Sequence, residues 1–561
     1  MSQQKEHNKP KFFTKNRILD SLFLAGLCII YSIVAFMNLG DDKAPQTFYR
    51  TEDEDVIAIK LKEPVKNPEV DFYVGMTEND FNLSFASAKG CKCHLDNNEV
   101  IDEEISKFSQ VNISGPFRWE HRTIPGDEIN VIFIRNEAHR EIDFGEIAVF
   151  SDDKRQEVSF YHFINRNLES DEALNVLQDE SELVAREATM MNSSYFDELY
   201  FAQTAYSYAT GQLGYENVHP PLGKILQSIP IAVTGRMTPF TWRFMGTLVG
   251  VFIIIAVYVL AKEIFEKSSF ARVAAILTAL SGLHFVQTRV GTVDSYLCLF
   301  TILSFIFMVK FLKTDGKFRY FLLSGLFYGC GFTVKWSGAF GGIGLALILF
   351  AYLAKSGAWD FKKKLFKNLF SKDIRKWVRR GFLCFIIVPG VVYCSSYLLF
   401  PNTTDAHSMN DVSKQSMRLY RYHKNETTPH PYSSKWYTWP ITLKPMLYEY
   451  DSSNNTSISL TGNYAIAYVS VLALLISAWF AWKKKDMQNS IIVGAWLGLW
   501  LPYALIGRTM FLYHYLPASI FAILAVVNMF YQIPGIRKII PYYLASVLIT
   551  FIICYPKMAG V

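Results

Sequence analysis

The sequence predicts a polytopic α-helical membrane protein with about 11 transmembrane helices and an all-β domain inserted in the first outer loop. Two observations predict this fold class. Of the 561 residues, 51% are hydrophobic and 15% are aromatic, and the apolar residues gather in runs of roughly 20, the length of a membrane crossing. Between residues 40 and 190 these runs give way to alternating apolar and polar residues, which are typical of strands.

The apolar runs place each expected span. They lie near 18–38, 242–262, 271–288, 293–312, 319–335, 338–354, 381–400, 463–482, 488–506, 514–532 and 539–556. The first run is too long for the core of a signal peptide and lacks a clear small-residue cleavage site, so we expect it to remain as a transmembrane helix.

The basic residues predict the orientation of these spans. The formal net charge is +6, but Lys and Arg occur in short clusters between the apolar runs, as topology determinants do. The clusters lie before residue 18 and at 313–319, 355–380, 483–485 and 537–538. They share one side, the cytoplasm, if the first helix runs outward. Membrane lipids are therefore the expected surroundings, and nucleic acid is not an expected partner.

This topology leaves three segments outside, namely 40–241, 401–462 and the turn from Arg508 to Tyr515. The runs at 70–74, 81–85, 130–134 and 141–150 alternate with period two between Asn, Asp and Gly turns, which favours an antiparallel β-sandwich. The last strands resemble the end of a galactose-binding-like jelly roll. A glycan-binding role and a role as spacer or interaction domain are both open, because a fold does not fix a function.

One short segment of the β region carries possible metal ligands. Cys91, Cys93 and His94 place three candidates within four residues. Without a second cluster they do not build a tetrahedral site. A structural or disulfide role is favoured, and no metal site is predicted.

The segment that returns from the β domain to the membrane holds the strongest chemical candidates. Asp197 and Glu198 stand side by side among aromatic residues, and His219 and Lys224 flank a Pro-Pro turn further on. Partial loss of hydration raises the basicity of a carboxylate and suits it to proton abstraction. The same pair is also common as a helix N-terminal feature, so both interpretations are open on residues alone.

Five motifs in order resolve this ambiguity. They are Asp197-Glu198 with His219 to Lys224, Trp242-Arg243, Gln287 to Ser295, Val334 to Gly338, and Arg508 to Pro517. Together they resemble the protein O-mannosyltransferase family, which is glycosyltransferase family 39 with the class C membrane glycosyltransferase fold. The resemblance covers roughly residues 190–561.

The topology, the strand pattern and, from about residue 190 onward, the resemblance together predict a division of the chain. Residues 1–39 form a cytoplasmic N-terminus and first helix, 40–190 the outer β-sandwich, 191–241 a catalytic first-loop segment, and 242–561 the transmembrane core with outer loop 401–462. This loop is similar to that of bacterial members, because eukaryotic members carry an inserted β-trefoil domain there. We therefore expect a multi-pass bacterial plasma-membrane enzyme with an extracytoplasmic active site.

The resemblance also implies a mechanism. The donor is a polyprenyl-phosphate hexose, mannose-like, and the acceptor hydroxyl belongs to a protein Ser or Thr or to a cell-surface glycan. Asp197 is the expected general base of an inverting displacement, with Glu198 orienting the acceptor or sharing the proton. Candidates for the donor phosphate and sugar are Arg289, Asp294, Lys335, Arg508, His514 and Tyr515, and candidates for the acceptor or loop are His219, Lys224, Trp436 and Trp439.

Several of these residues have a second interpretation. Asp294 either holds Arg289 and lines the same cavity or caps a helix start. Lys224 suits interfacial snorkelling, and Trp436 and Trp439 either stack on a sugar or mark the membrane interface. Fixed Arg and Lys can replace a metal ion at a phosphate monoester, so no cofactor is expected although a divalent metal is possible.

Two other function classes are open. A transporter or lipid-linked-sugar flippase would account for many spans, but it would place charges near mid-membrane and show an internal repeat. A membrane-anchored glycan-binding protein would need only one anchor helix. The charges cluster at one interface and no repeat is visible, so the sequence favours the enzyme.

Overall fold

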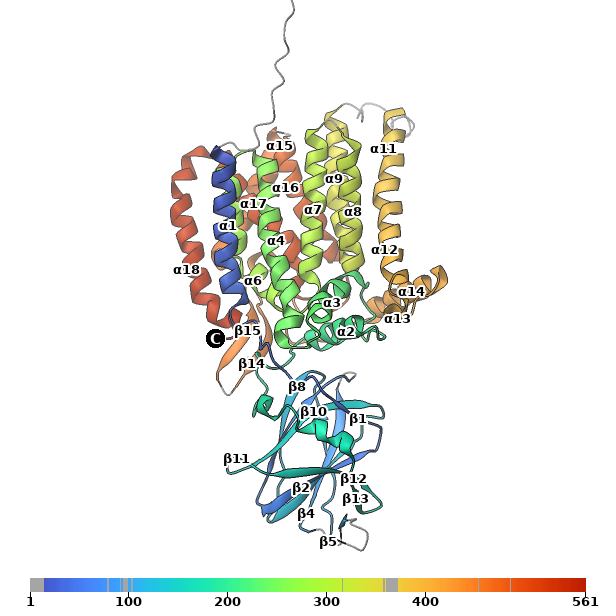
Figure 1. The fold of residues 1–561 in the computed structure, drawn as a ribbon. Helices are drawn as coiled ribbons and strands as arrows, with labels where there is room; N and C mark the ends of the chain where they lie inside the picture. The colour runs from blue at the N-terminus through green and yellow to red at the C-terminus, as the bar shows by residue number, and fades with distance from the viewer. Residues whose placement is uncertain are drawn as a thin grey trace, which may run out of the picture.

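A computed structural model describes residues 15–561 except 78–79, 91, 94–98, 102–103, 315, 357–358, 360–371, 453 and 485. Cys91 and His94 of the possible metal segment, and part of the basic cluster at 355–380, lie outside these residues. The described chain forms a helix bundle with a β domain at one end (Figure 1). The fold class predicted from the sequence is confirmed.

The β domain consists of two antiparallel sheets, as predicted for a sandwich. The first has the order β1 (Tyr49–Thr51), β10 (Ile142–Ser151), β3 (Glu69–Val74) and β8 (Arg118–Thr123), with β11 (Lys154–Arg155) paired to β10. The second has the order β5 (Lys92–Cys93), β6 (Glu99–Val100), β13 (Asn167–Glu169), β12 (Val158–Ile164), β2 (Val56–Val65), β9 (Ile129–Asn136), β4 (Phe81–Ala88) and β7 (Ser109–Ile113). The four alternating runs found in the sequence correspond to β3, β4, β9 and β10.

Apolar side chains from both sheets fill the space between them. Ile59 on β2, Phe72 on β3, Ile132 on β9 and Phe144 on β10 belong to one buried cluster. The alternation that predicted the strands therefore describes a real inward face. Two short 3₁₀ helices, Glu172–Leu177 and Ser181–Leu183, lead the chain away from this domain.

The bundle contains α1 and the helices that follow the β domain. Their bounds are α1 Lys15–Phe36, α2 Glu198–Thr210, α3 Leu222–Thr234, α4 Pro239–Phe265, α5 Ser268–Ala279, α6 Gly282–Arg289, α7 Asp294–Lys313, α8 Phe318–Val334, α9 Ala339–Lys355, α11 Lys372–Phe382, α12 Val388–Leu398, α13 Pro401–Thr404, α14 Met409–Asn425, α15 Tyr464–Lys484, α16 Met487–Trp500, α17 Leu516–Gln532 and α18 Ile540–Ala559. A hairpin of β14 (Met446–Asp451) and β15 (Thr456–Leu460) precedes α15.

The eleven predicted spans are all helical, but not all have full length. Within the described residues, eight helices are long and apolar enough to cross a membrane, or nine if the bent pair α5–α6 counts as one. The prediction at 319–335 corresponds to α8 with 17 residues, and that at 488–506 to α16 with 14 residues and a 3₁₀ turn. A 17-residue helix rises only about 26 Å, less than the roughly 30 Å hydrocarbon core.

The span predicted at 271–288 is broken rather than continuous. Helices α5 and α6 meet at an angle of 56°. Ser281 caps the start of α6, and the side-chain amide of Asn463 donates to the carbonyl of Leu280 at 3.0 Å. These side chains satisfy the backbone groups that the break leaves free. The break shortens α6 so that Arg289 lies near the β-domain end of the bundle.

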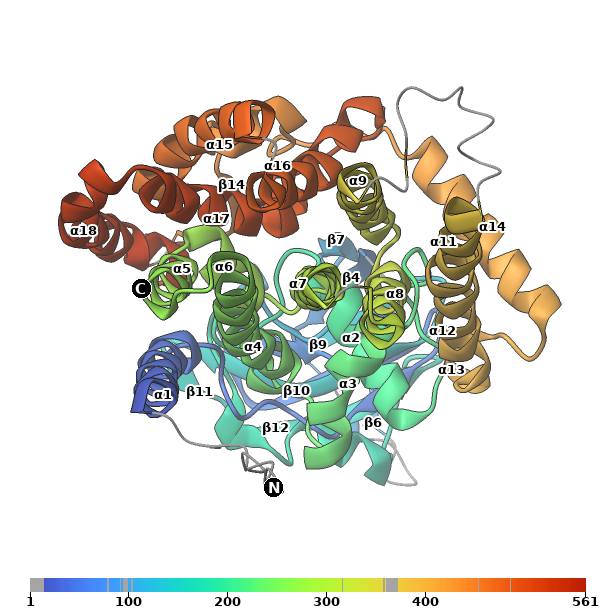
Figure 2. The same ribbon diagram turned by 90° about the horizontal axis from the view of Figure 1, so that it is seen from above.

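The β domain lies directly under the helices rather than beside them. Viewed from above, its strands appear behind α2, α3, α4 and α7 (Figure 2). The described parts of the basic clusters, at 313–319 without 315, 372–380, 483–484 and 537–538, lie at the opposite end of the bundle (Figure 1). The chain is therefore a multi-pass membrane protein whose β domain and basic clusters are at opposite ends, as the topology prediction requires.

A shared hydrophobic core fixes the β domain to the bundle. Phe117 and Trp119, from the β8 segment, pack in one buried cluster with Ala205 of α2, Ile231 of α3 and Trp242 of α4. Trp119 is 2% exposed and Trp242 is fully buried. The docking surface is thus continuous with the protein interior, and we infer that the domain and the helices form one rigid unit.

Hydrogen bonds to backbone carbonyls join the same two parts. The hydroxyl of Ser194 donates to the carbonyl of Pro116 at 2.6 Å, and the amide of Ser194 donates to the carbonyl of Phe117 at 3.0 Å. Both ends of the β domain also meet, because Nη1 of Arg243 donates to the carbonyls of Leu39 and Met190 at 2.9 and 2.7 Å. The chain that follows Ser194 into α2 is therefore held from the β-domain side.

Candidate active site

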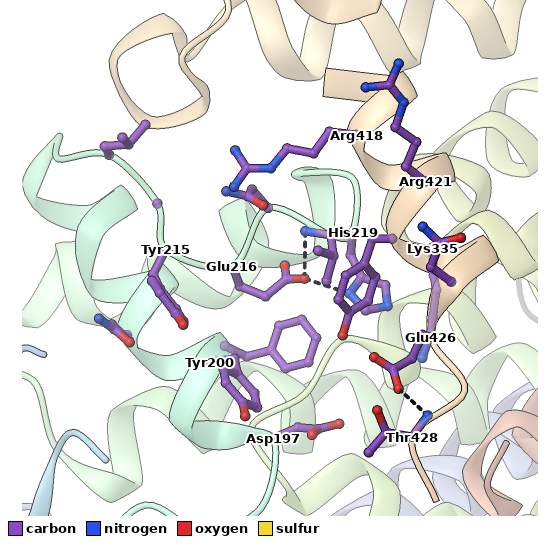
Figure 3. A pocket seen from close by; sticks show the side chains of 18 of the residues that line it. Asp197, Tyr200, Tyr215, Glu216, His219, Lys335, Arg418, Arg421, Glu426 and Thr428 are labelled. Atoms are coloured by element: carbon purple, nitrogen blue, oxygen red, sulfur yellow. Dashed lines mark hydrogen bonds and ion pairs between the residues drawn. The ribbon is translucent and has the colours of Figure 1, made fainter. Parts of the chain in front are cut away.

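A cavity of about 1770 Å³ lies where the β domain, α2, α14 and the turn before α17 meet. It is larger than the roughly 300–1,000 Å³ typical of a site for one small ligand. Its lining residues include Asp197, Glu216, His219, Lys335, Arg508 and His514. Figure 3 shows Asp197 at one end of this cavity and Arg418 and Arg421 of α14 at the other. The size allows two substrates side by side.

Asp197 is presented to the cavity by an unusual backbone turn. Phe196, just before it, has φ of 53°, which is the left-handed region that bulky residues rarely adopt. The ring of Phe196 packs against Tyr448 of β14 with centroids 4.6 Å apart. We infer that this packing holds the strained residue in place and so directs the Asp197 carboxylate outward from the start of α2.

The electrostatic environment of Asp197 suits a general base. Burial in the cavity floor raises the pKa of its carboxyl to about 7, with Asp294 and Glu216 acting in the same direction and Lys335 and Arg508 opposing them. A base is most effective when its pKa lies near the working pH. Asp197 therefore lines the cavity with a raised pKa, and its role as the general base stays a prediction.

Glu198 has a different role from the one predicted. Its side chain is fully buried and does not line the cavity. Its two oxygens accept from Nε and Nη2 of Arg243 at 2.8 and 2.7 Å, from the Trp242 indole at 3.1 Å and from the Gly291 amide at 2.8 Å. Because every lone pair faces a protein donor, Glu198 cannot orient an acceptor or share its proton. It anchors the start of α2 to α4 and to the loop before α7.

The sequence analysis missed Glu216, which organises the next part of the site. Its carboxylate accepts from Nδ1 of His219 at 2.8 Å and from Nζ of Lys224 at 2.6 Å. Burial favours its neutral form, but the charge of Lys224 and the hydrogen bonds from Lys224 and His219 outweigh this and lower the pKa of Glu216 to about 2. The signal was available in the sequence, since Glu216 lies three residues before His219.

This network corrects the interpretation of Lys224 as a snorkelling residue. Lys224 is 1% exposed and also donates to the backbone carbonyls of Glu216 and His219. It does not line the large cavity, whereas His219 does. Burial lowers the pKa of His219, so its ring is neutral near pH 7, and Nε2 is the nitrogen not engaged with Glu216.

Lys335 and Asp294 form a buried ion pair in the site. Nζ of Lys335 donates to the Asp294 oxygens at 2.9 and 3.2 Å, and Lys335 also lies 4.9 Å from the centre of the Tyr513 ring. Lys335 lines the cavity, as predicted. Asp294 therefore holds Lys335 rather than Arg289.

Arg289 is not part of the cavity. Its Nη2 donates to the carbonyls of Met37 and Asn38 at 3.0 and 2.6 Å, and its guanidinium lies over the Phe285 ring. It closes the end of α1 against α6. Arg289 therefore does not line the large cavity, and its contact with the donor phosphate stays a prediction.

Arg508 and His514 do line the cavity. Arg508 donates to Nδ1 of His423, whose Nε2 donates to the carbonyl of Val218 at 2.8 Å. This arrangement requires a neutral His423, and burial, assisted by the charge of Arg508, lowers the pKa of His423 to about 4. Arg508 and Lys335 are thus cations held in place in the lining of the cavity.

The remaining aromatic candidates do not line the cavity. Tyr515 is buried and accepts from the Trp496 indole at 3.0 Å. Trp436 packs on Trp500, with ring centroids 4.7 Å apart. Trp439 is 1% exposed and stacks at 6.0 Å behind the ring of His514. These residues pack behind the side chains that line the cavity, and sugar stacking by Trp436 or Trp439 stays a prediction.

The fold and the site can now be compared with known proteins. The structure of the Saccharomyces cerevisiae protein O-mannosyltransferase Pmt1-Pmt2 complex bound to the sugar donor matches with a TM-score of 0.57 and 14% identity, over 65% of this chain and 87% of that chain. The likeness concerns the fold alone. It confirms that the bundle, with its polar cavity at one end, is a class C membrane glycosyltransferase fold.

Sequence comparison gives the particular family. The model described as the C-terminal four-transmembrane region of protein-O-mannosyltransferase matches residues 408–559, and that of dolichyl-phosphate-mannose-protein mannosyltransferase matches residues 218–371. The polyprenol-phosphate-mannose protein mannosyltransferases of Mycobacterium tuberculosis and Mycolicibacterium smegmatis are each 23% identical, over 65% of this chain and 83% and 84% of theirs. The chain belongs to the protein O-mannosyltransferase family, as its motifs predicted.

Proposed function

We propose that this protein transfers mannose from a polyprenyl-phosphate mannose donor to a hydroxyl group of a protein acceptor. The names of the mycobacterial relatives support the donor and the acceptor class. The observation that carries the proposal for this chain is the location of Asp197. Its carboxylate lines a cavity large enough for two substrates and has a pKa of about 7.

The proposed reaction is one inverting displacement. The acceptor oxygen attacks the anomeric carbon of mannose while the bond from that carbon to the phosphate oxygen breaks. The proton of the acceptor hydroxyl moves to Asp197, and polyprenyl phosphate leaves with the bonding electron pair. The raised pKa of Asp197 lies near the working pH, which suits the carboxylate to accept this proton.

Lys335 and Arg508 are the proposed partners of the leaving phosphate. Both are cations that line the cavity, and each is fixed by a side-chain partner, Asp294 for Lys335 and His423 for Arg508. Preorganised charges of this kind stabilise the negative charge that develops on a leaving group. A phosphate monoester needs no diphosphate-binding metal, so we propose that transfer is independent of divalent ions.

We place the cavity on the outer face of a bacterial plasma membrane. The basic clusters lie at the end of the bundle opposite to the β domain and the cavity (Figure 1). Positively charged segments stay in the cytoplasm. The support for a bacterial enzyme is the short connection between α12 and α15, which holds no further domain.

The test is transfer of labelled mannose by purified protein. Asp197→Asn is expected to abolish transfer to peptide while donor binding and the elution profile in detergent stay as in the wild type. Glu187→Gln is the matched control, because it removes an exposed carboxylate ten residues upstream that does not line the cavity. Wild-type transfer rates in Asp197→Asn would remove the assigned base.

A further inference from the structure

The outer part of the cavity carries a row of cations that the proposed chemistry does not use. Lys414, Arg418 and Arg421 line the cavity from α14. Their spacing of four and three residues places them on one face of the helix. Figure 3 shows Arg418 and Arg421 at the end of the cavity far from Asp197. They are therefore additional to the two cations proposed for the donor phosphate.

These cations are little compensated by the protein. Arg418 approaches the side-chain amide oxygen of Asn217 at 3.2 Å, and Lys414 contacts Asp411 at 3.3 Å in a pair whose side chains are 70% and 26% exposed. Among the described residues, Arg421 forms no ion pair within 4.0 Å. Exposed arginines with free donors are suited to bind carboxylates in a bidentate manner.

The facing wall of the cavity belongs to the β domain, and its charges are already paired. Arg50 contacts Asp143 at 2.7 Å and Glu141 at 3.3 Å, so these carboxylates do not neutralise α14. Thr77 also lines this wall, and its carbonyl accepts from Gln203 of α2. An acceptor that reaches Asp197 from outside must therefore pass between the docked β domain and a cationic helix.

From this arrangement we infer that the acceptor is an extended polypeptide segment with acidic residues near its hydroxyl group, selected by Arg418 and Arg421 across from the β domain. The inference rests on the proposed function and adds the substrate class. The cavity holds donor sugar and acceptor hydroxyl at the Asp197 end, which leaves the α14 end for the residues that flank the hydroxyl. Charges that lie away from the reacting atoms, as Arg418 and Arg421 do, affect which acceptor binds. They do not affect the transfer step itself.

The experiment compares three peptides of equal length that carry one threonine flanked by Asp and Glu, by Asn and Gln, or by Lys. Purified full-length protein receives polyprenyl-phosphate mannose and each peptide, and kcat/KM is measured at low and moderate salt. Two exposed charge pairs predict a preference of about fivefold for the acidic over the neutral peptide, which decreases as salt screens it.

Charge reversal tests the two arginines. The double variant Arg418→Glu and Arg421→Glu is expected to invert the ratio of kcat/KM between acidic and lysine peptides. This ratio does not depend on the fraction of active protein. Lys424→Glu is the matched control, because Lys424 is exposed on the same helix but does not line the cavity. Its ratio is expected to equal that of the wild type.

The possible contrary results are distinct. Equal use of the three peptides by the wild type, or an unchanged ratio in the double variant, would overturn the inference and leave the proposed function intact. If the double variant had a higher KM for the donor with all three peptides, the two arginines would be assigned to the donor phosphate. This result would also overturn the inference. Transfer to a polysaccharide but to no peptide would refute the proposed acceptor class and the inference together.

Discussion

Glu198→Ala separates a structural carboxylate from a catalytic one. In the structure, Glu198 and Arg243 are 0% and 1% exposed, and the Glu198 oxygens also accept from Trp242, Gly291 and the Tyr195 amide. Removal of one partner from a buried ion pair leaves an uncompensated charge and costs about 3–5 kcal/mol. We therefore expect the free energy of unfolding to decrease by that amount.

The assay is equilibrium unfolding of the purified protein by a denaturing detergent in mixed micelles. Glu157→Ala is the control, because Glu157 pairs with Lys62 in a contact whose side chains are 77% and 67% exposed. An exposed pair of this kind contributes about 0–1 kcal/mol. The double variant Glu198→Ala and Arg243→Ala is expected to be less destabilised than the sum of its single variants, since both residues act as one unit.

One result would refute this reasoning. If Glu198→Ala unfolded within about 1 kcal/mol of the wild type and yet lost mannose transfer, Glu198 would act in the reaction and not in the anchor.

Three further predictions follow from the site and the docking surface. Transfer by the wild type is expected to decrease as the pH falls through about 7, because Asp197 is protonated below its pKa. Lys335→Met should move this acidic limb of the pH–rate profile to higher pH, and Asp294→Asn should move it to lower pH. A limb that moves in neither variant would contradict the assignment of Asp197 as the general base. Transfer measured after EDTA treatment should equal that of untreated protein, whereas a loss restored by Mg²⁺ or Mn²⁺ would show that the fixed cations do not suffice. Trp119→Ala should lower the free energy of unfolding by about 3–5 kcal/mol, while Trp482→Ala, which removes a side chain 70% exposed on α15, should leave it nearly unchanged if the shared core holds the two parts together.

Much of the fold was predictable because its signals are local. Runs of apolar residues and period-two alternation depend only on neighbours in the chain, and they identified the eleven helical spans and the strands β3, β4, β9 and β10. The length of α8 and the break between α5 and α6 were not predictable in this way. The break depends on Asn463, which is more than 180 residues from the carbonyl that it binds.

The sequence predicted those residues of the cavity lining that belong to the ordered motifs. Asp197, Lys335, Arg508, His219 and His514 all line the cavity, as expected from the ordered motifs. Glu198 shows the limit of this approach, since one step along the start of a helix turns a side chain by about 100°. Its neighbour faces the substrate cavity while Glu198 faces the interior.

Contacts between segments far apart in the sequence determine the features of the site that the sequence did not predict. Arg289 lies in a matching motif, but its partners are carbonyls at the end of α1, which no local pattern indicates. The same holds for the β-domain wall, because Arg50 and Asp143 reach the cavity only after the domain packs under α2. The sequence placed a β domain in the first loop and could not show that it contributes to the site.

The contact of Arg243 with both Leu39 and Met190 has a consequence for the architecture of the chain. One guanidinium nitrogen lies within hydrogen-bonding distance of the last carbonyl before the β domain and of a carbonyl after it. The chain therefore enters and leaves the β domain at neighbouring positions. Domains whose ends lie close together in this way can be inserted into an existing fold. A relative without this domain needs only a short turn there to keep the path from α1 to α2. The helical scaffold and the acceptor wall can thus diverge separately, each keeping the same junction.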